Sequence, residues 1–191
     1  MFFLRQPSSE TTQRFISSQR DLPFSYPEVG ATAGELPSGY TIDRNRIRLG
    51  EGKETYERAV AALKLWKQSD LGWVRIVPPE TPIEVGAVVA ILTRHFGFWS
   101  LNACRVVYLI DEDGPARKTG FGYGTLSSHV ERGEERFTIE WCRDDNSVWY
   151  HILAFSRPNQ LLVKLGFLLA RKLQKRFARD SLAVMVSLSN P

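Results

Sequence analysis

One long amphipathic stretch at the carboxyl end, from Pro158 to Val186, constrains the fold more than any other part of the chain. Proline fixes its own φ and lacks an N–H donor, so the sequence predicts a helix that begins at Pro158. Apolar residues then recur at steps of three and four and form one stripe, which consists of Leu161, Leu162, Leu165, Leu168, Leu169, Leu173 and Phe177. A stripe of this length needs a wide apolar surface to cover it.

The preceding part of the chain supplies such a surface, because its apolar residues alternate with a period of two between short turns. The predicted strands are residues 40–49, 73–77, 85–99 with a break near Gly97, 102–110, 118–126, 136–143 and 147–156, and a helix over 53–71 follows the first of them. Strands joined by short turns pair antiparallel, and one face of such a sheet must be covered. The sequence therefore predicts an α+β helix-grip fold, in which a curved, seven-stranded antiparallel sheet wraps around the long C-terminal helix.

The first 39 residues are too few to form a core of their own. Ser8 or Ser9 can cap a short helix that runs to about Arg20, and residues 27–39 contain enough proline and glycine to predict a loop that wraps the surface. At 191 residues the chain fits a single domain. In this interpretation residues 1–39 are an N-terminal helix and wrapping loop, and residues 40–191 are the helix-grip core.

The composition is ordinary for a soluble globular protein, with 43% hydrophobic and 24% charged residues. No apolar run approaches the ~20 residues that a transmembrane helix needs. The two cysteines, Cys104 and Cys142, are too few for a disulfide scaffold, so we expect a reducing, cytoplasmic location. No regularly spaced metal ligands and no cofactor motif occur, and the sequence predicts neither a metal nor a cofactor.

The predicted C-terminal helix is strongly basic, although the whole chain carries a formal charge of only +4. No acidic residue occurs between Arg157 and Arg179, and the basic ones are Arg157, Lys164, Arg171, Lys172, Lys175, Arg176 and Arg179. Such a run forms either a solvated face or a surface that binds an anionic partner. The charge is too local to predict a nucleic-acid-binding protein.

Several segments together resemble one known family. They are Val29-Gly30-Ala31-Thr32, Gly39-Tyr40, Asp43-Arg44, Leu71-Gly72-Trp73, the run from Gly120 to Leu126, His129, the run from Gly133 to Phe137, and Phe155-Ser156-Arg157-Pro158. The chain is thereby similar, from about Tyr26 to about Ala183, to the DUF1990 family, also called UPF0548, whose name records an unknown function. The predicted order of strands and helices also resembles the Bet v 1, START and polyketide-cyclase superfamily, which implies a space for a ligand between sheet and helix.

Aromatic residues are the main candidates for binding a ligand in that space. Phe137, Ile139 and Trp141 share one face of a predicted strand, which should point toward the helix. The other candidates are Trp73, Tyr108, Tyr123 and Tyr150, together with Asp43 and Arg44 as a polar anchor. These side chains either line an open pocket or fill it. The sequence therefore favours a protein that binds a small apolar or amphipathic molecule.

An enzymatic alternative rests on His129, Glu131 and Glu135, which cluster around a predicted hairpin turn. An imidazole near carboxylates can support acid–base catalysis of a cyclase or hydrolase type, as can Asp43 with Arg44. A charged turn is more often only solvated, and no nucleophile motif is present, so the sequence does not favour an enzyme. A third interpretation is an interaction module that docks through the basic C-terminal helix.

The glycine-rich run from Gly120 to Gly124 does not predict a phosphate-binding loop, because strands rather than a strand and a helix flank it. Its three glycines share one face of the strand. They indicate either a sharp bend or close approach of another element, or missing side chains that help to leave a cavity.

Overall fold

The computed structural model describes residues 1–159 and 167–190, with the side chains of all of these except 167–169. Seven strands form one curved antiparallel sheet in the order β2-β8-β7-β6-β5-β4-β3. They are β2 (Thr41–Glu51), β3 (Val74–Val77), β4 (Val88–His95), β5 (Phe98–Glu112), β6 (Ala116–Thr125), β7 (Glu131–Cys142) and β8 (Ser147–Pro158). The predicted seven-stranded sheet is confirmed. A two-residue strand that was not predicted, β1 (Phe2–Phe3), pairs with β5.

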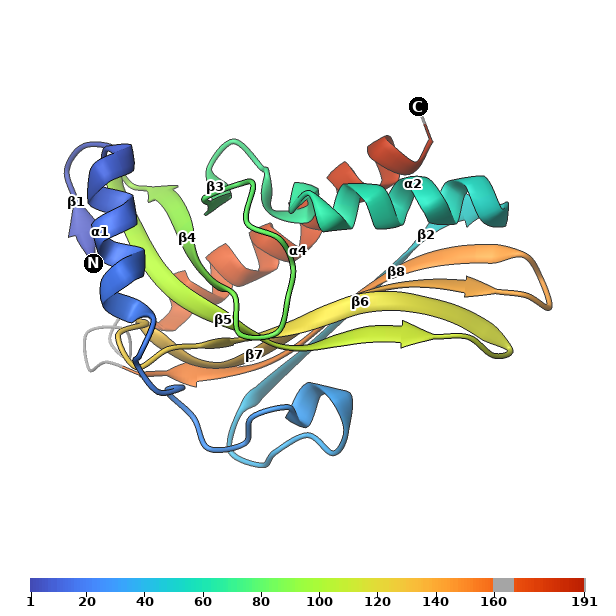
Figure 1. Cartoon of the computed structure of the whole chain (residues 1–191), viewed down its shortest axis with the longest axis horizontal. Coiled ribbons are helices and arrows are strands. Elements are labelled where there is room, and N and C mark those ends of the chain that lie inside the picture. The colour runs from blue at the N-terminus through green and yellow to red at the C-terminus, as the bar shows by residue number, and fades with distance from the viewer. Residues whose placement is uncertain (160–166, 191) are drawn as a thin grey trace.

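Two helices cover the inner, concave face of this sheet (Figure 1). They are α2 (Gly52–Lys64), which follows β2, and α4 (Phe167–Ser189) at the carboxyl end. A short 3-10 turn, η2 (Lys67–Ser69), continues from α2. The helix α4 packs against β2, β8, α2 and η2, so the sheet wraps around it. The predicted helix-grip architecture is confirmed.

The predicted start of the C-terminal helix is wrong. Pro158 is the last residue of β8 and is paired with Glu131 of β7. Pairing of β8 with β2 on its other side already ends at Ser156, so Pro158 sits at the strand end, where a missing N–H costs little. The stripe residues Leu161, Leu162 and Leu165, the side chains of Leu168 and Leu169, and Lys164 lie outside what the structure describes.

The first residues cover the outer face of the sheet. The helix α1 (Ser9–Gln19) is capped by Ser8, whose side chain accepts a hydrogen bond from the Thr11 backbone N–H at 3.2 Å. Its Phe15 and Ile16 pack with Leu92, Leu101 and Leu126 of the sheet region. The loop that follows carries the 3-10 turn η1 (Ala31–Ala33) and packs on β7 and β8, on the side opposite α2 (Figure 1).

The strand β7 begins five residues earlier than predicted, at Glu131 instead of Arg136. Its charged start, Glu131-Arg132-Gly133-Glu134-Glu135, looks like a turn because intrinsic strand propensity is low there. Pairing of the whole segment with β8, and of Glu134 and Glu135 also with β6, overrides this propensity. The earlier start of β7 changes where the carboxyl groups of Glu131 and Glu135 lie. Glu131 and Glu135 share the face of β7 that carries Phe137 and Ile139, and that face is the concave one.

One part of the space between the sheet and the helices is closely packed with side chains, and we call this part the filled half. Phe121, Phe137, Ile139 and Tyr150 are each at most 1% exposed and pack with residues of α2 and with Met185 of α4. The Tyr150 and Ser181 hydroxyl groups are hydrogen-bonded at 3.0 Å, which ties β8 to α4. The other half contains the candidate site.

Candidate functional site

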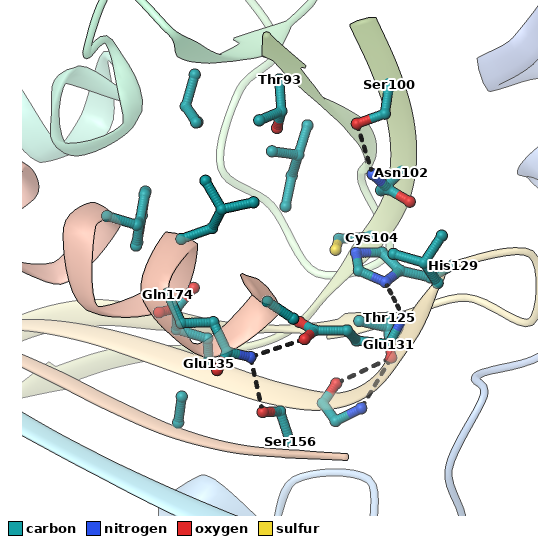
Figure 2. Close-up of a pocket in the computed structure, with 18 of the residues that line it drawn as sticks. Thr93, Ser100, Asn102, Cys104, Thr125, His129, Glu131, Glu135, Ser156 and Gln174 are labelled. Atoms are coloured by element: carbon teal, nitrogen blue, oxygen red, sulfur yellow. Dashed lines mark hydrogen bonds between the residues drawn. The ribbon is translucent and has the colours of Figure 1, made fainter. Parts of the chain in front are cut away.

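A cavity of about 720 Å³ lies between the concave face of the sheet and the described beginning of α4 (Figure 2). This volume is within the roughly 300–1,000 Å³ that small-molecule sites usually have. Its wall is mostly apolar and includes Trp73, Val74, Ile91, Tyr123, Ile152, Ala170, Leu173, Phe177 and Ala178. The exposed side chains of Phe2, Phe96, Phe98 and Lys175 also line it, and they mark its opening to solvent.

One row of residues crosses four strands along the cavity wall. Antiparallel pairing places Asp43 opposite Ala154, Ala154 opposite Glu135, and Glu135 opposite Tyr123. Paired residues project to the same face of a sheet, so all four side chains point to the concave side. Two acidic residues distant in sequence thus meet in one apolar cavity.

Glu135 is the central acidic group of this row. The Tyr123 hydroxyl donates a hydrogen bond to Glu135 Oε2 at 3.0 Å. Burial raises the pKa of Glu135 to about 7, and the negative charges of Glu131 and Asp43 add to this effect, which the hydrogen bond from Tyr123 opposes. The group therefore changes its charge near neutral pH.

Glu131 lies on the same face and reaches toward α4. Gln174 Nε2 donates to Glu131 Oε1 at 2.8 Å and to Ser156 Oγ at 3.1 Å (Figure 2). Burial raises the pKa of Glu131 above its ordinary value, whereas the hydrogen bond from Gln174 lowers it. We call Glu131 and Glu135 together the acidic wall.

Within the described side chains of residues 1–159 and 170–190, neither carboxyl group of the acidic wall forms an ion pair with a basic side chain, although the nearby charge of Arg171 lowers the pKa of Glu131. Asp43 differs, because Arg171 of α4 donates two hydrogen bonds to its carboxylate at 2.5 and 2.6 Å. This bidentate pair neutralises Asp43 and joins β2 to α4. The uncompensated acidity of the cavity therefore resides in Glu131 and Glu135.

His129 lines the cavity as well, but as a neutral group. Its Nδ1 accepts a hydrogen bond from the Glu131 backbone N–H at 3.0 Å, and burial lowers its pKa to about 4. Among the hydrogen bonds of the described residues, none joins the His129 ring to the side chain of Glu131 or Glu135. The three residues therefore share the cavity wall without a hydrogen bond between the His129 ring and either carboxyl group.

A second, uncharged polar wall comes from β4 and β5, with Thr93, Ser100, Asn102 and Cys104 (Figure 2). Asn102 Nδ2 donates to Ser100 Oγ at 3.4 Å. The Asn102 Oδ1 atom is buried and accepts no hydrogen bond from any described residue. The cavity wall therefore offers a hydrogen-bond acceptor on this side too.

The structure brings six of the predicted site residues together at the cavity: Asp43, Trp73, Tyr123, His129, Glu131 and Glu135. Phe137, Ile139, Trp141 and Tyr150 belong to the adjoining filled half or pack against it. Arg44 and Tyr108 point the other way, to the outer face. For Arg44 the reason is strand alternation, since its neighbour Asp43 points inward.

Tyr108 is turned outward by an irregularity in β5. The pairing of β5 with β6 shifts register between Val106 and Tyr108, so Val106 faces inward and Tyr108 outward. There the Tyr108 ring lies over Gly122, where an added Cβ would come within 2.6 Å of it. Gly124 makes room for the Tyr26 ring in the same way, and an added Cβ at Gly120 would meet the backbone of β7, so the hypothesis that these glycines help to leave a cavity is wrong.

Several polar residues of the site were not predicted from the sequence, among them Asn102, Ser156 and Gln174. The only signal for Gln174 is its helical spacing from Ala170 and Ala178, which lie on the same face of α4. Asn102 and Ser156 are uncharged residues within strands, and nothing local distinguishes them from residues of the outer face.

The basic run of the C-terminal region is largely occupied by internal contacts. Arg171 pairs with Asp43, while Arg176 and Arg179 pair with Asp180. The Arg157 guanidinium lies over the Tyr40 ring at 4.3 Å. Lys172 and Lys175 are the exposed lysines of the described part of this run, so less charge is available for an anionic partner than the sequence indicates.

Comparison with known proteins identifies the family to which this chain belongs. The model of a family described as a domain of unknown function (DUF1990) matches residues 25–184. The chain belongs to this family. A UPF0548 protein from Dictyostelium discoideum is 40% identical over 200 residues, which cover 95% of this chain and 92% of that protein. A UPF0548 protein from Deinococcus radiodurans is 38% identical over 199 residues, with 97% and 98% covered.

Among solved structures, the chain is similar to a hypothetical protein from Helicobacter pylori. The TM-score is 0.54 at 11% sequence identity, and the match covers 88% of this chain and 96% of that one. At 11% identity, this similarity shows that the DUF1990 protein shares the fold of that structure and shows nothing about its function.

Within residues 1–159 and 167–190, no helix is both long and apolar enough to cross a bilayer. In the same residues, no group of three His, Cys, Asp or Glu side chains is arranged to hold a metal ion.

Proposed function

We propose that this DUF1990 protein binds a small amphipathic molecule in the cavity between the sheet and α4. The observation that carries the proposal is the open volume of about 720 Å³ beside a tightly packed core. Protein interiors are normally packed at the density of organic crystals, and an unfilled space of this size sacrifices dispersion contacts and apolar burial. A ligand that fills the space recovers both.

The polarity of the wall supports an amphipathic ligand. Trp73, Ile91 and Phe177 offer an apolar surface for most of the ligand, whereas Glu131, Glu135 and Asn102 offer polar contacts at separate positions. A mostly apolar pocket with few, well-placed polar groups is typical of small-molecule sites. We favour binding over acid–base catalysis because His129 Nδ1 already accepts a hydrogen bond from the Glu131 backbone N–H, and no described hydrogen bond joins its ring to the carboxyl group of Glu131 or Glu135.

The proposal is tested with the neutral fluorescent probe N-phenyl-1-naphthylamine. We expect saturable binding with one site per chain and a fluorescence increase. Replacing Ala154, which lies in the cavity wall between Asp43 and Glu135, by phenylalanine should weaken binding at least tenfold, because the ring occupies the space the probe needs.

The matched control is Ala61→Phe, an identical enlargement at an exposed position of α2 outside the cavity. It should bind the probe like the unaltered protein. If the unaltered protein shows no saturable binding, or if Ala154→Phe and Ala61→Phe bind equally well, the proposal is wrong. Circular dichroism of each variant verifies that it has folded.

For the location, we propose the cytoplasm. Cys104 and Cys142 are both free thiols, which suits a reducing compartment. Fractionation of cells that express the chain, with antibody detection in each fraction, tests this assignment.

A further inference from the structure

Two carboxyl groups without an ion-pair partner among the described residues line the cavity, and they limit which ligands it can bind. Glu131 and Glu135 lie in a mostly apolar space, and the described part of the chain supplies no basic side chain in ion-pair contact with either of them. Burying a carboxylate without a counter-charge is costly. Their hydrogen bonds from Gln174 and Tyr123 satisfy only part of the accepting capacity of two carboxyl groups.

We infer that the ligand of this cavity carries a protonated amine, which the carboxyl groups of Glu131 and Glu135 bind. This inference rests on the proposed function and adds the chemical class of the ligand. An ammonium group donates up to three hydrogen bonds and supplies the missing positive charge. An apolar body attached to it then fills the remaining volume along Ile91, Leu173 and Phe177.

Other charged groups around the cavity, among the described residues, do not form ion pairs with Glu131 or Glu135. Arg171 acts on Glu131 through its charge but spends its bidentate hydrogen bonds on Asp43, and the Glu134 carboxylate points to the outer face, where it accepts hydrogen bonds from the loop around η1. Arg132 also lines the cavity, but its guanidinium donates to Asn159 Oδ1. Lys175 is exposed at the opening.

A polar group on the opposite wall independently supports a ligand that donates hydrogen bonds. The buried Asn102 Oδ1 lacks a donor among the described residues, and it lies on β5, across the cavity from the acidic wall (Figure 2). Asn102 Oδ1 and the acidic wall therefore both call for a hydrogen-bond donor, whereas Ser69 Oγ, a further atom of the lining without a partner in the described part of the chain, can donate or accept. A fatty acid or another anionic amphiphile would place its acceptors beside those of Glu131, Glu135 and Asn102.

The test compares three molecules that share one alkyl chain and differ in the head group. Dodecylamine, dodecanol and dodecanoate compete at pH 8, below their micellar concentrations, with bound N-phenyl-1-naphthylamine. We expect dodecylamine to displace the probe at a concentration at least tenfold lower than dodecanol requires, and dodecanoate to be the weakest. In Glu131→Gln and Glu135→Gln the ratio of dodecanol to dodecylamine concentrations should fall, and in the double variant it should approach one.

Glu112→Gln is the matched control, because Glu112 is an exposed glutamate of β5 outside the cavity. It should keep the full preference for the amine. A ratio near one in the unaltered protein, tightest binding of dodecanoate, or a ratio unchanged by Glu131→Gln and Glu135→Gln overturns the inference, while probe binding itself leaves the proposed function intact. Absence of probe binding contradicts the proposed function instead.

Discussion

At the scale of single residues, Glu135 shows how strand pairing sets the chemistry of a side chain. It lies between Tyr123 on one neighbouring strand and Ala154 on the other, and both side chains face the same cavity. Neither neighbour supplies a positive charge. The consequence is a carboxyl group whose pKa burial raises to about 7.

This pKa predicts a pH-dependent stability that Glu135→Gln should remove. Because the pKa in the folded state lies above the ordinary value of 4.5, the folded protein favours the protonated form. The stabilisation is fully present below pH 4.5 and is lost as the pH rises through 7. Glu135→Gln should therefore be more stable than the unaltered protein at pH 8, by about 1–3 kcal/mol, and differ little at pH 4.5.

Urea denaturation at the two pH values measures this difference. Glu112→Gln, at an exposed position, should show no comparable dependence on pH. Equal stability of Glu135→Gln and the unaltered protein at pH 8 would mean that Glu135 is ionised there without penalty.

Residue-level reasoning from the sequence succeeded where strands alternate regularly. Phe137 and Ile139 do face the helices, because a period of two decides the face once the strand is recognised. It failed for the placement of Glu131 and Glu135, since a charged segment that is paired in a sheet cannot be distinguished from a solvated turn without knowledge of the partner strands. It failed for Tyr108 because a register shift in β5 reverses the face and leaves no mark in composition.

At the scale of elements, Glu134 fastens the wrapping loop to the outer face of β7. Its carboxylate accepts hydrogen bonds from the Tyr26 hydroxyl at 2.7 Å, the Gly30 N–H at 2.7 Å and the Thr32 N–H at 2.9 Å, and a further one from the Thr32 hydroxyl. One side chain thus orders a segment more than a hundred positions away. Loops with few regular backbone hydrogen bonds depend on such anchors.

We predict that Glu134→Ala releases this loop while the sheet stays folded. Hydrogen exchange at the Gly30 and Thr32 amides should accelerate, because their acceptor is removed, and stability should fall by about 2 kcal/mol. Hydrogen exchange followed by mass spectrometry measures the first effect, and urea denaturation the second. Glu112→Ala should change neither, and unchanged exchange at both amides in Glu134→Ala would refute the anchoring role.

Element boundaries were predictable only where local chemistry marks them. The Ser8 cap of α1 is visible in the sequence because a side-chain oxygen at that place satisfies a free N–H group. Pro158 was misleading, since a proline suits a strand end as well as a helix start, and only the pairing with Glu131 decides between them.

At the scale of the whole molecule, the space between sheet and helices is divided into a filled half and a hollow half. Trp66, Phe121, Phe137 and Tyr150 occupy the first. The second holds about 720 Å³ of open volume. The helix α4 passes through both, with Leu173 and Phe177 along the cavity and Met185 in the packed core.

We predict that equivalent truncations in the two halves have unequal costs. Phe137→Ala should lower the free energy of unfolding by about 3–5 kcal/mol, because it opens a hole among fully buried side chains. Leu173→Ala should cost about 1 kcal/mol or less, because Leu173 already borders open space on one side. Urea denaturation of both variants gives the comparison, and equal losses would show that the cavity is closed in solution.

The division has a consequence for how members of this family can diverge. Under the proposed function, substitutions around the hollow half change which molecules fit, whereas substitutions in the filled half lower the stability of the fold. Recognition can then diverge at Ala154 and Gln174 with little loss of stability. One inherited framework would in that case serve different organisms with chemically distinct ligands.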